Sequence, residues 1–341
     1  MRYLVTGHTG FKGAWMTLLL SELGHEVYGV SLDPIPGGLY EAAGLSNLVQ
    51  GDHRQDIRNA DELRRIFREV NPDVVVHLAA QPLVLDSYER PRYTFETNVM
   101  GTLNVLESLG ECENLKATLI ITTDKVYRNV GKISGYAEDE PLGGDDPYSA
   151  SKAMADILVN SWRTSFPASP VAVARAGNVI GGGDVSKDRL LPDLIQSIVG
   201  GEPITLRNPD AVRPWQHVLD CVYGYYVLIQ EMLASGLEGD WNFGPDAESV
   251  ISVGQIVKDA QEYLGMPAGW DYSPGLRKEA LLLTLDATKA KQNLDWSNLA
   301  PYPRCLYLTL DWVAALQSGR TPLEVASEQV NSYLGEAKAL R

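Results

Sequence analysis

Short runs of apolar, β-branched residues recur along the first half of the chain, and the stretches between them carry apolar residues at helical spacing. Strands are predicted at residues 2–7, 26–32, 73–78, 117–123 and 171–176, and helices near 11–23, 60–69, 93–109 and 148–165. A continuous apolar run predicts a strand that is buried on both faces, and alternation with helices predicts right-handed βαβ crossovers. The pattern therefore predicts an α/β fold with a doubly wound parallel sheet.

The texture of the sequence changes after about residue 176. Glycine and proline become frequent in 177–184, 209–215 and 241–246, and this density marks loops. We therefore expect a second, smaller domain of mixed α/β structure that meets the substrate. The predicted division gives residues 1–175 and about 211–240 to the sheet-containing domain, and about 176–210 and 241–341 to the substrate domain.

Composition narrows the classes of function. The chain has 341 residues, 45% of them hydrophobic, and a formal net charge of −15. That charge is spread along the chain and argues against nucleic acid or an anionic membrane as partner. No apolar run approaches the roughly 18 residues of a membrane-spanning helix, and residues 1–6 read as a strand and not as a signal peptide. We expect a cytoplasmic protein that is not bound to a membrane.

Metal and disulfide chemistry are not expected. Cys112, Cys221 and Cys305 lie far apart and have no spacing that suits zinc or a disulfide framework. The five histidines are scattered and form no pair at helical spacing. The cysteine pattern fits a reducing compartment.

A glycine-rich stretch, V-T-G-H-T-G-F-K-G, joins the first predicted strand to the first helix. Gly7 permits a tight turn, Gly10 lets the backbone approach a pyrophosphate, and Gly13 allows the helix to pack on the strand. Asp33 stands at the end of the second strand, where a carboxylate accepts hydrogen bonds from a ribose diol and repels a 2′-phosphate. The combination predicts a Rossmann-type site for NAD in preference to NADP. An ordinary glycine-bearing turn, with Asp33 merely capping a loop, is the alternative.

A second group of polar residues indicates redox chemistry. Tyr148 follows Pro147 at the start of a predicted helix, and Lys152 lies four residues further on the same face. A free phenol is a poor base, but a lysine one turn away and the positive ring of an oxidised nicotinamide would both favour the tyrosinate. Tyr148 could then accept a hydroxyl proton while a hydride leaves the same carbon. Taken alone, a Y-x-x-x-K pattern is commonly just helix surface.

These motifs resemble the extended short-chain dehydrogenase/reductase superfamily over essentially the whole chain. Within it, the sequence is most similar to the CDP-glucose 4,6-dehydratases. The motifs that carry the resemblance are G-H-T-G-F-K-G, A-A-Q-P-L-V, T-N-V-M-G-T, T-x-D-K, G-G-x-D-P-Y-S-x-S-K, R-A-G-N-V-I-G-G-G-D, K-D-R-L-x-P-D and W-N-F-G-P. They are far more specific than a glycine triplet.

The resemblance implies roles for five residues. Thr123 and Tyr148 would contact the sugar 4-hydroxyl, Asp124 would be the acid and Lys125 the base of an elimination, and Lys152 would hold the nicotinamide ribose. The chemistry is coherent, because oxidation of C4 to a ketone acidifies the C5 proton, and an acid can then protonate the departing C6 hydroxyl. An extended backbone would point Asp124 and Lys125 in different directions. A base role needs the neutral amine of Lys125; the alternative is a charged lysine that pairs with Asp124 or a phosphate.

Further contacts are implied in the same way. The expected NAD contacts are Gly7, Thr9, Gly10, Phe11, Lys12, Gly13, Asp33, Asp56, Ile57, Leu78, Ala79, Ala80, Asn98, Thr122, Tyr148 and Lys152. The expected substrate contacts are Gln81, Asn178, Arg189 and Arg213, with the two arginines on the diphosphate, since a guanidinium can bind two oxygens at once. For each arginine, a structural ion pair is the competing interpretation.

The function expected from the resemblance is NAD-dependent dehydration of CDP-D-glucose to CDP-4-dehydro-6-deoxy-D-glucose. A dehydratase for another nucleotide sugar, a C4 epimerase and a non-catalytic NAD-binding protein are the alternatives. Leu85, Asp86 and Val185 depart from the family pattern near the expected substrate pocket. The helices near 93–109 and 148–165 resemble those that pair in a four-helix interface, which implies a homodimer or a higher homo-oligomer.

Overall fold

The computed structural model describes residues 1–132, 134–200, 203–266, 269–273 and 282–340. A seven-stranded sheet forms its centre, and every neighbouring pair of strands in it is parallel. Its strands, in spatial order, are β10 (Gly239–Phe243), β6 (Val171–Ala176), β5 (Ala117–Ile121), β4 (Val74–His77), β1 (Arg2–Thr6), β2 (Glu26–Ser31) and β3 (Gly51–Arg54). The prediction of a doubly wound parallel sheet is confirmed.

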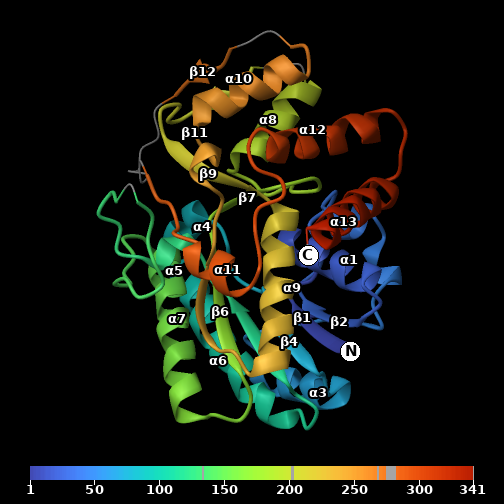
Figure 1. The fold of residues 1–341 in the computed structure, drawn as a ribbon, viewed down its shortest axis with the longest axis vertical. Helices are drawn as coiled ribbons and strands as arrows, with labels where there is room; N and C mark the ends of the chain where they lie inside the picture. Colours follow the sequence, from blue (N-terminus) through green and yellow to red (C-terminus); the bar gives the residue numbers. More distant parts are fainter. Residues whose placement is uncertain (133, 201–202, 267–268, 274–281, 341) are drawn as a thin grey trace.

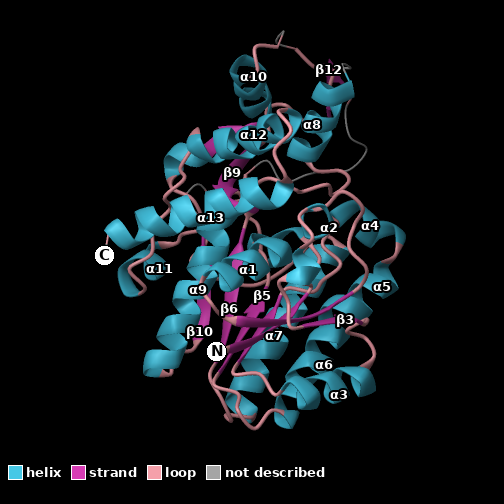
Figure 2. Cartoon of the chain, turned by 90° about the vertical axis from the view of Figure 1, so that its right-hand side faces the viewer, coloured by secondary structure: helices cyan, strands magenta, loops and turns pink. Residues whose placement is uncertain are grey.

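Alternate side chains of each central strand enter different apolar cores. Val5, Val76 and Leu119 pack into a core on one face of the sheet, whereas Val75 and Ile120 pack into the core on the other face. Helices α1 (Phe11–Glu22), α9 (Val218–Ser235) and α13 (Pro322–Ala339) cover the first face, and α3 (Ala60–Val70), α6 (Gly101–Ser108) and α7 (Pro147–Ser165) cover the second (Figures 1 and 2). Burial on both faces explains why most positions of these strands are apolar.

Two strands of the sheet were absent from the predicted set. β3 reads G-D-H-R and β10 reads G-D-W-N-F, and both lie at the edges of the sheet. Neither has the continuous apolar run that marks a central strand. The predicted helix over 93–109 is also interrupted, because a π-helical turn (Glu96–Met100) separates α5 (Pro91–Phe95) from α6.

A smaller layer lies beyond the carboxyl ends of the central strands (Figure 1). It contains a three-stranded sheet of β7 (Asn178–Ile180), β9 (Val212–His217) and β11 (Val250–Ser252), and a two-stranded pair of β8 (Thr205–Leu206) and β12 (Asp271–Tyr272). Helices α8 (Leu190–Gly200), α10 (Val253–Tyr263) and α12 (Arg304–Gln317) share its apolar core. Three short helices complete the chain: α2 (Leu39–Ala42), α4 (Val84–Glu89) and α11 (Thr288–Asn293).

Sheet membership differs at two strands from the predicted domain boundaries. β9 belongs to the small sheet, although its residues fall in the range 211–240, and β10 belongs to the large sheet, although it extends past residue 240. α9 runs between them against the large sheet. The division of the chain into two domains stays a prediction.

Candidate active site

Most of the predicted site residues lie at one end of the large sheet, where its parallel strands have their carboxyl ends. They follow the carboxyl ends of four parallel strands: β1 leads into the glycine-rich loop, β4 into 78–81, β5 into 122–125 and β6 into Asn178. The first turns of α1 and α7 open at the same edge. Ligands of open α/β sheets bind at this kind of edge, where loops from several strands converge.

The glycine-rich loop has the geometry of a phosphate cradle. Gly7 adopts φ +75°, and a Cβ atom there would lie 2.6 Å from the backbone nitrogen of Ala79. A Cβ on Gly13 would lie 2.0 Å from the carbonyl oxygen of Gly7. Gly10 is the N-cap residue of α1 and has no side chain that could cap its first turn, so the amide groups there are open to an anion. These residues therefore fit the pyrophosphate of a dinucleotide.

The neighbours of this loop continue the predicted cofactor site. The Thr9 hydroxyl lies 2.7 Å from that of Ser31 and donates to the carbonyl of Leu32, which joins the loop to the end of β2. Asp33 is exposed directly after β2. Lys12 places Nζ 5.9 Å from the centre of the Tyr225 ring on α9. A ring at Phe11 lies beside Gly181 at the start of the small layer.

Sequence reasoning missed the histidine inside the loop. The ring of His8 is buried against Gly29, where any Cβ would lie 2.3 Å from it, and its Nε2 lies 2.8 Å from Asp52 Oδ1. Tyr40 donates to the other oxygen of Asp52. A glycine in the middle of β2 was the available signal, since it marks a close approach by another group.

The loop after β4 is held by its own polar groups. Gln81 donates through its backbone nitrogen to Asn98 Oδ1 at 2.8 Å, and Asn98 Nδ2 donates to Ser151 Oγ on α7 at 2.9 Å. The Gln81 side-chain amide bonds to Leu83 and to Thr94. Both residues are therefore engaged in fixing the loop; Leu78, Ala79 and Ala80 form its beginning, beside Gly7.

The end of β5 presents the predicted acid and base. Asp124–Val126 form a 3-10 turn with Thr123 as its N-cap, so the backbone at Asp124 and Lys125 is not extended. The Thr123 hydroxyl donates to Asp124 Oδ1 at 2.9 Å, and Lys125 Nζ lies 3.7 Å from the same oxygen. The turn brings the two charged side chains together because the chain curls as soon as it leaves the sheet.

Asp124 and Lys125 differ in their exposure to solvent. The side chain of Asp124 is 1% exposed and that of Lys125 is 32% exposed. Asp124 Oδ2 is buried and has no hydrogen-bond partner among the described residues. It lies against Gly177, where a Cβ would stand 3.1 Å from it. A buried carboxylate oxygen without a partner is costly unless a ligand or a proton satisfies it.

Tyr148 and Lys152 lie on the first turns of α7, whose N-cap Asp146 accepts a hydrogen bond from Ser149. Burial raises the pKa of Tyr148 to about 12, against the lowering effects of a hydrogen bond with Thr123 and of the charge on Arg189. Burial, and then the charge of Lys12, lower the pKa of Lys152 to about 7. Lys152 Nζ donates to the carbonyl of Ile121 at 2.9 Å.

The predicted effect of Lys152 on the phenol stays a prediction. Thr123 and Arg189 have the largest lowering effects on the pKa of Tyr148, and the Lys152 amine donates to the carbonyl of Ile121 at the end of β5. Sequence spacing placed the two residues on one helix face, but it could not tell which acceptor the flexible lysine would choose.

The remaining predicted residues lie at the two ends of the site. Asp56 follows β3 and pairs with Arg58, and Ile57 is buried beside Gly101. Arg189 Nη1 lies 3.6 Å from Asp184 Oδ2, and Arg213 on β9 donates to the carbonyl of Val212. Asn178 begins β7, and Thr122 donates to Asp156 on α7.

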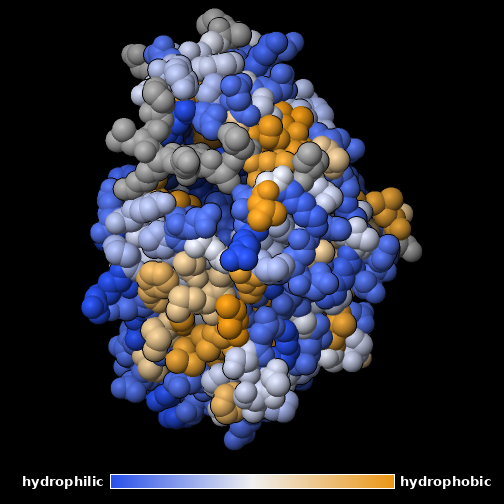
Figure 3. Space-filling model, turned by 90° about the vertical axis from the view of Figure 1, so that its left-hand side faces the viewer, coloured by the Kyte–Doolittle hydropathy of each residue, from blue (hydrophilic) through white to orange (hydrophobic). Residues whose placement is uncertain are grey.

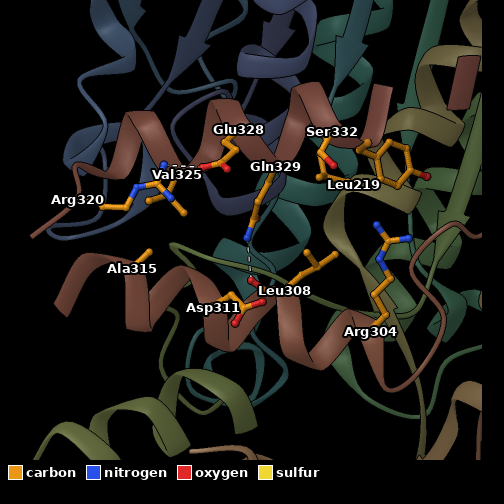
Figure 4. A pocket seen from close by; sticks show the side chains of 11 residues that line it. Leu219, Arg304, Leu308, Asp311, Ala315, Arg320, Val325, Glu328, Gln329 and Ser332 are labelled. Atoms are coloured by element: carbon orange, nitrogen blue, oxygen red, sulfur yellow. Dashed lines mark hydrogen bonds and ion pairs between the residues drawn. The ribbon is translucent and has the colours of Figure 1, made fainter. Parts of the chain in front are cut away.

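A separate cavity opens between α12 and α13, away from the residues above (Figure 4). Arg320 pairs with Glu328 there, and Gln329 donates to the carbonyl of Leu308. None of the predicted site residues lines this cavity. Within the described ranges, no cluster of histidine, cysteine and carboxylate side chains is arranged to hold a metal ion, and no helix is long and apolar enough to cross a membrane.

Comparison with known proteins places the chain among sugar-nucleotide enzymes. It is 41% identical over 98% of its length to a CDP-glucose 4,6-dehydratase of Salmonella typhimurium, of which 96% is covered. It is 27% identical to a dTDP-glucose 4,6-dehydratase of the same organism, over 92% of this chain and 93% of that one.

Solved structures agree with these relatives. The structure of dTDP-glucose 4,6-dehydratase from Bacillus anthracis in complex with NAD is 25% identical with a TM-score of 0.80, covering 95% of this chain and 99% of that one. UDP-glucose 4-epimerase from Thermotoga maritima with UDP-glucose gives 25% identity and a TM-score of 0.82, over 93% and 100%. The sequence model of the NAD dependent epimerase/dehydratase family matches residues 3–244. The chain therefore belongs to the NAD dependent epimerase/dehydratase family.

Proposed function

We propose that the protein catalyses the NAD-dependent dehydration of CDP-D-glucose to CDP-4-dehydro-6-deoxy-D-glucose. The observation that carries this proposal is the turn after β5, which brings Asp124 and Lys125 together next to Thr123, while Thr123 and Asp124 act on the Tyr148 phenol. The relative that is 41% identical is named for this reaction. Plain C4 redox chemistry needs only Tyr148 and Lys152, so an added acid and amine point to elimination.

The first task is to remove the proton from the sugar 4-hydroxyl. The Thr123 side chain acts on the Tyr148 phenol and lowers its pKa, and we assign both to O4, with Tyr148 as the acceptor of the proton. The phenol is protonated in the free chain, because burial holds its pKa near 12. The charge of Arg189 already acts to lower that pKa, and a further positive charge at the site would act in the same direction.

The second task is to remove water across C5 and C6. We assign Lys125 to the C5 proton and Asp124 to the C6 hydroxyl. In that role Asp124 gives its proton to the leaving oxygen, water departs, and Lys125 later returns its proton to C5. Asp124 Oδ2 is buried and has no partner in the described part of the chain, which suits a group whose partner is the substrate. Lys125 Nζ lies 3.7 Å from Asp124 Oδ1 at rest, and transfer of one proton from the amine to the carboxylate would give the neutral base and the protonated acid that the elimination requires.

The residues around the glycine-rich loop fit NAD. We assign the amide groups after Gly10 to the pyrophosphate, Asp33 to the adenosine ribose, Asp56 and Ile57 to the adenine, and Lys152 to the nicotinamide ribose. When bound, NAD⁺ supplies the hydride acceptor for C4 and the hydride donor for C6, so that the overall reaction is redox-neutral. Lys152 reaches this end of the site from α7, where its amine is fixed by Ile121.

Arg189, Arg213 and Asn178 are our candidates for the diphosphate and the sugar. Arg189 is bound only loosely to Asp184, at 3.6 Å, and a phosphate could replace that partner. Two of the residues that depart from the family pattern contact neighbouring residues. Asp86 forms a bidentate ion pair with Arg90, and Val185 lies beside Gly38. The cytidine base is proposed from the similarity to the CDP-glucose enzyme.

A C4 epimerase is the second candidate, because UDP-glucose 4-epimerases share the fold. Epimerisation needs C4 oxidation and reduction, and it gives no work to an acid and an amine at C5 and C6. A dehydratase acting on another nucleotide sugar would use the same residues. A non-catalytic NAD-binding protein would need neither Asp124 nor Tyr148.

One experiment separates these possibilities. Purified protein is incubated with NAD⁺ and, separately, with CDP-, dTDP-, UDP- and GDP-glucose. Loss of one water by mass spectrometry, together with the alkali-induced absorbance of a 4-keto sugar, is expected with CDP-glucose. A product of unchanged mass would indicate an epimerase, a preference for another nucleotide would change the substrate, and no turnover with any of them would refute the proposal.

We also propose that the protein pairs through the surface of α7. Met154 and Ile157 on this helix, and Met100 on the π-helical turn beside it, are 47%, 57% and 49% exposed. Figure 3 shows hydrophobic side chains gathered on the lower part of the face where α7 lies. Such a patch marks an interface, and a homodimer or a higher homo-oligomer would bury it. The cytoplasmic location stays a prediction.

A further inference from the structure

A fully buried arginine lies behind the turn that carries Asp124 and Lys125. Arg175 on β6 is 1% exposed. Its guanidinium group binds Asp156 through two nitrogens at 2.9 and 2.6 Å, the Tyr127 hydroxyl at 2.7 Å and Asp240 Oδ2 at 2.8 Å. It also donates to the carbonyl of Glu138 at 3.0 Å. All three nitrogens of the guanidinium group therefore donate hydrogen bonds.

The cluster of Arg175 and Asp156 is hydrogen-bonded to the residues that flank the turn on both sides. On the side before the turn, the Thr122 hydroxyl donates to Asp156 Oδ2 at 3.0 Å. On the far side, the Tyr127 hydroxyl accepts from Arg175 and donates to Asn242 Oδ1 on β10 at 2.8 Å. The residues between these anchors are those we assign to O4, O6 and C5. Asp156 also lies one helical turn after Lys152 on α7.

Stability alone does not call for such a cluster. β6 reads V-A-V-A-R-A and all six of its residues are buried, so a strand of this kind could be apolar at every position if the partners of Arg175 were apolar too. Burying an ion pair is commonly no better than burying apolar groups of similar volume. Here the charges of Arg163, Asp240, Arg175 and Asp156 alternate through successive ion pairs and cancel. Such a pairing fixes directions, since the bidentate geometry of a guanidinium allows little variation.

We propose that Arg175 and Asp156 are positioning residues that hold the turn after β5, and so set the places of Asp124 and Lys125 for the elimination step. This inference rests on the proposed function. The two residues act through Thr122 and Tyr127 and do not touch the substrate. Elimination needs an acid and a base aligned on adjacent carbons at the same time, and a misplacement of about 1 Å can cost two orders of magnitude. Oxidation at C4 takes its proton acceptor, Tyr148, from α7 and not from the turn, and Thr123 adds only a hydrogen bond to O4.

The test removes single hydroxyl groups and leaves the charges in place. Tyr127→Phe deletes the bonds to Arg175 and Asn242 and keeps the stacking of this ring on Tyr136. Thr122→Val deletes the bond to Asp156, and Thr122→Ser keeps a hydroxyl and should restore part of the function. Tyr333→Phe is the control, because it removes a buried hydroxyl that donates to Asp220 at 2.7 Å, far from the turn.

Two rates are measured for each NAD-loaded variant with CDP-glucose. Rapid mixing follows reduction of the nicotinamide, which reports C4 oxidation, and exchange of the C5 proton with deuterated solvent reports the base. In Tyr127→Phe and Thr122→Val we expect C5 exchange and product formation to fall by roughly tenfold to a hundredfold, with C4 oxidation within about twofold of the wild type. Tyr333→Phe should keep both rates, and Thr122→Ser should retain more C5 exchange than Thr122→Val does.

The outcomes are distinct. Equal slowing of both steps, or unchanged C5 exchange in Tyr127→Phe and Thr122→Val, would overturn the inference, since a merely structural role would not separate the two steps. A wild-type protein that oxidises no glucose nucleotide would instead refute the proposed function. The melting temperature of every variant is recorded. If Tyr127→Phe or Thr122→Val lowers the melting temperature no more than Tyr333→Phe does, and yet loses C5 exchange, the result supports a positioning role.

Discussion

Lys152 Nζ donates a hydrogen bond of 2.9 Å to the carbonyl oxygen of Ile121, so that the first turns of α7 are tied to the end of β5. Lys152 is 6% exposed to solvent. Burial, and after it the charge of Lys12, lower its pKa from 10.5 to about 7. This one bond joins the lysine that we assign to the nicotinamide ribose to the strand that leads into the residues we assign to elimination.

The lowered pKa of Lys152 predicts how stability depends on pH in the cofactor-free protein. Between about pH 7 and 10.5 the unfolded chain binds a proton at Lys152 that the folded chain does not. The free energy of unfolding should therefore rise with pH across this window, by at most about 1.4 kcal/mol per pH unit from this group. Urea unfolding at several pH values measures it. In Lys152→Met this contribution should vanish, and an identical pH dependence in both proteins would contradict the assignment.

Lys125→Met tests the base. We expect this variant to lose dehydration and exchange of the C5 proton with deuterated solvent, because the thioether cannot accept a proton. Binding of NAD, followed by calorimetry, should be unchanged, since Lys125 lies on the turn after β5 and away from the glycine-rich loop. Normal C5 exchange in the variant would remove Lys125 from the base role.

Gly177→Ala tests the position of Asp124. The new Cβ would lie 3.1 Å from Asp124 Oδ2 and 3.5 Å from a side-chain carbon of Pro214, so the carboxylate must shift by a few tenths of an ångström. We expect dehydration to slow by roughly tenfold with little change in NAD binding. Gly110→Ala is the matched control, because no atom lies within 4 Å of its added Cβ. Equal turnover of the two variants would show that Asp124 tolerates displacement.

Gly7→Ala tests the phosphate cradle. Gly7 and Gly24 have nearly the same backbone angle, φ +75° and +76°, but only at Gly7 does an added Cβ meet other atoms, 2.6 Å from the nitrogen of Ala79. Gly24→Ala should therefore cost about 1 kcal/mol of stability from the left-handed conformation alone and keep NAD binding. Gly7→Ala should cost more and lose NAD binding. Calorimetric titration with NAD⁺ compares them, and tight binding by Gly7→Ala would contradict the predicted cradle.

Ile157→Arg tests the proposed interface on α7. A charge at this exposed apolar position should disfavour burial against a second copy, and the variant should sediment as a smaller species than the wild type. Leu340→Arg is the control, since Leu340 is also exposed, at 71%, but lies at the end of α13. Sedimentation of the wild type as a monomer, or of Ile157→Arg as an unchanged oligomer, would contradict an interface at this helix.

Much of the fold could be predicted because the central strands are buried on both faces. Burial favours apolar residues on both faces of β1, β4 and β5, and the resulting apolar runs can be recognised in the sequence. The edge strands β3 and β10 are less completely buried, and they carry the charged residues Asp52, Arg54 and Asp240. β10 pairs with β6, a strand that lies far away along the chain.

The sequence by itself determined the parallel sheet, the glycine-rich loop and the set of residues at its edge, because each leaves a local mark in residue type and spacing. Only the tertiary structure decided that Asp124 and Lys125 share a 3-10 turn. It also decided that Lys152 bonds to Ile121 and that Arg175 bonds to Tyr127 directly after that turn. These relationships join residues on separate strands and helices. Which partner a buried polar group finds is set by the packing of those elements, and spacing along the chain carries no record of it.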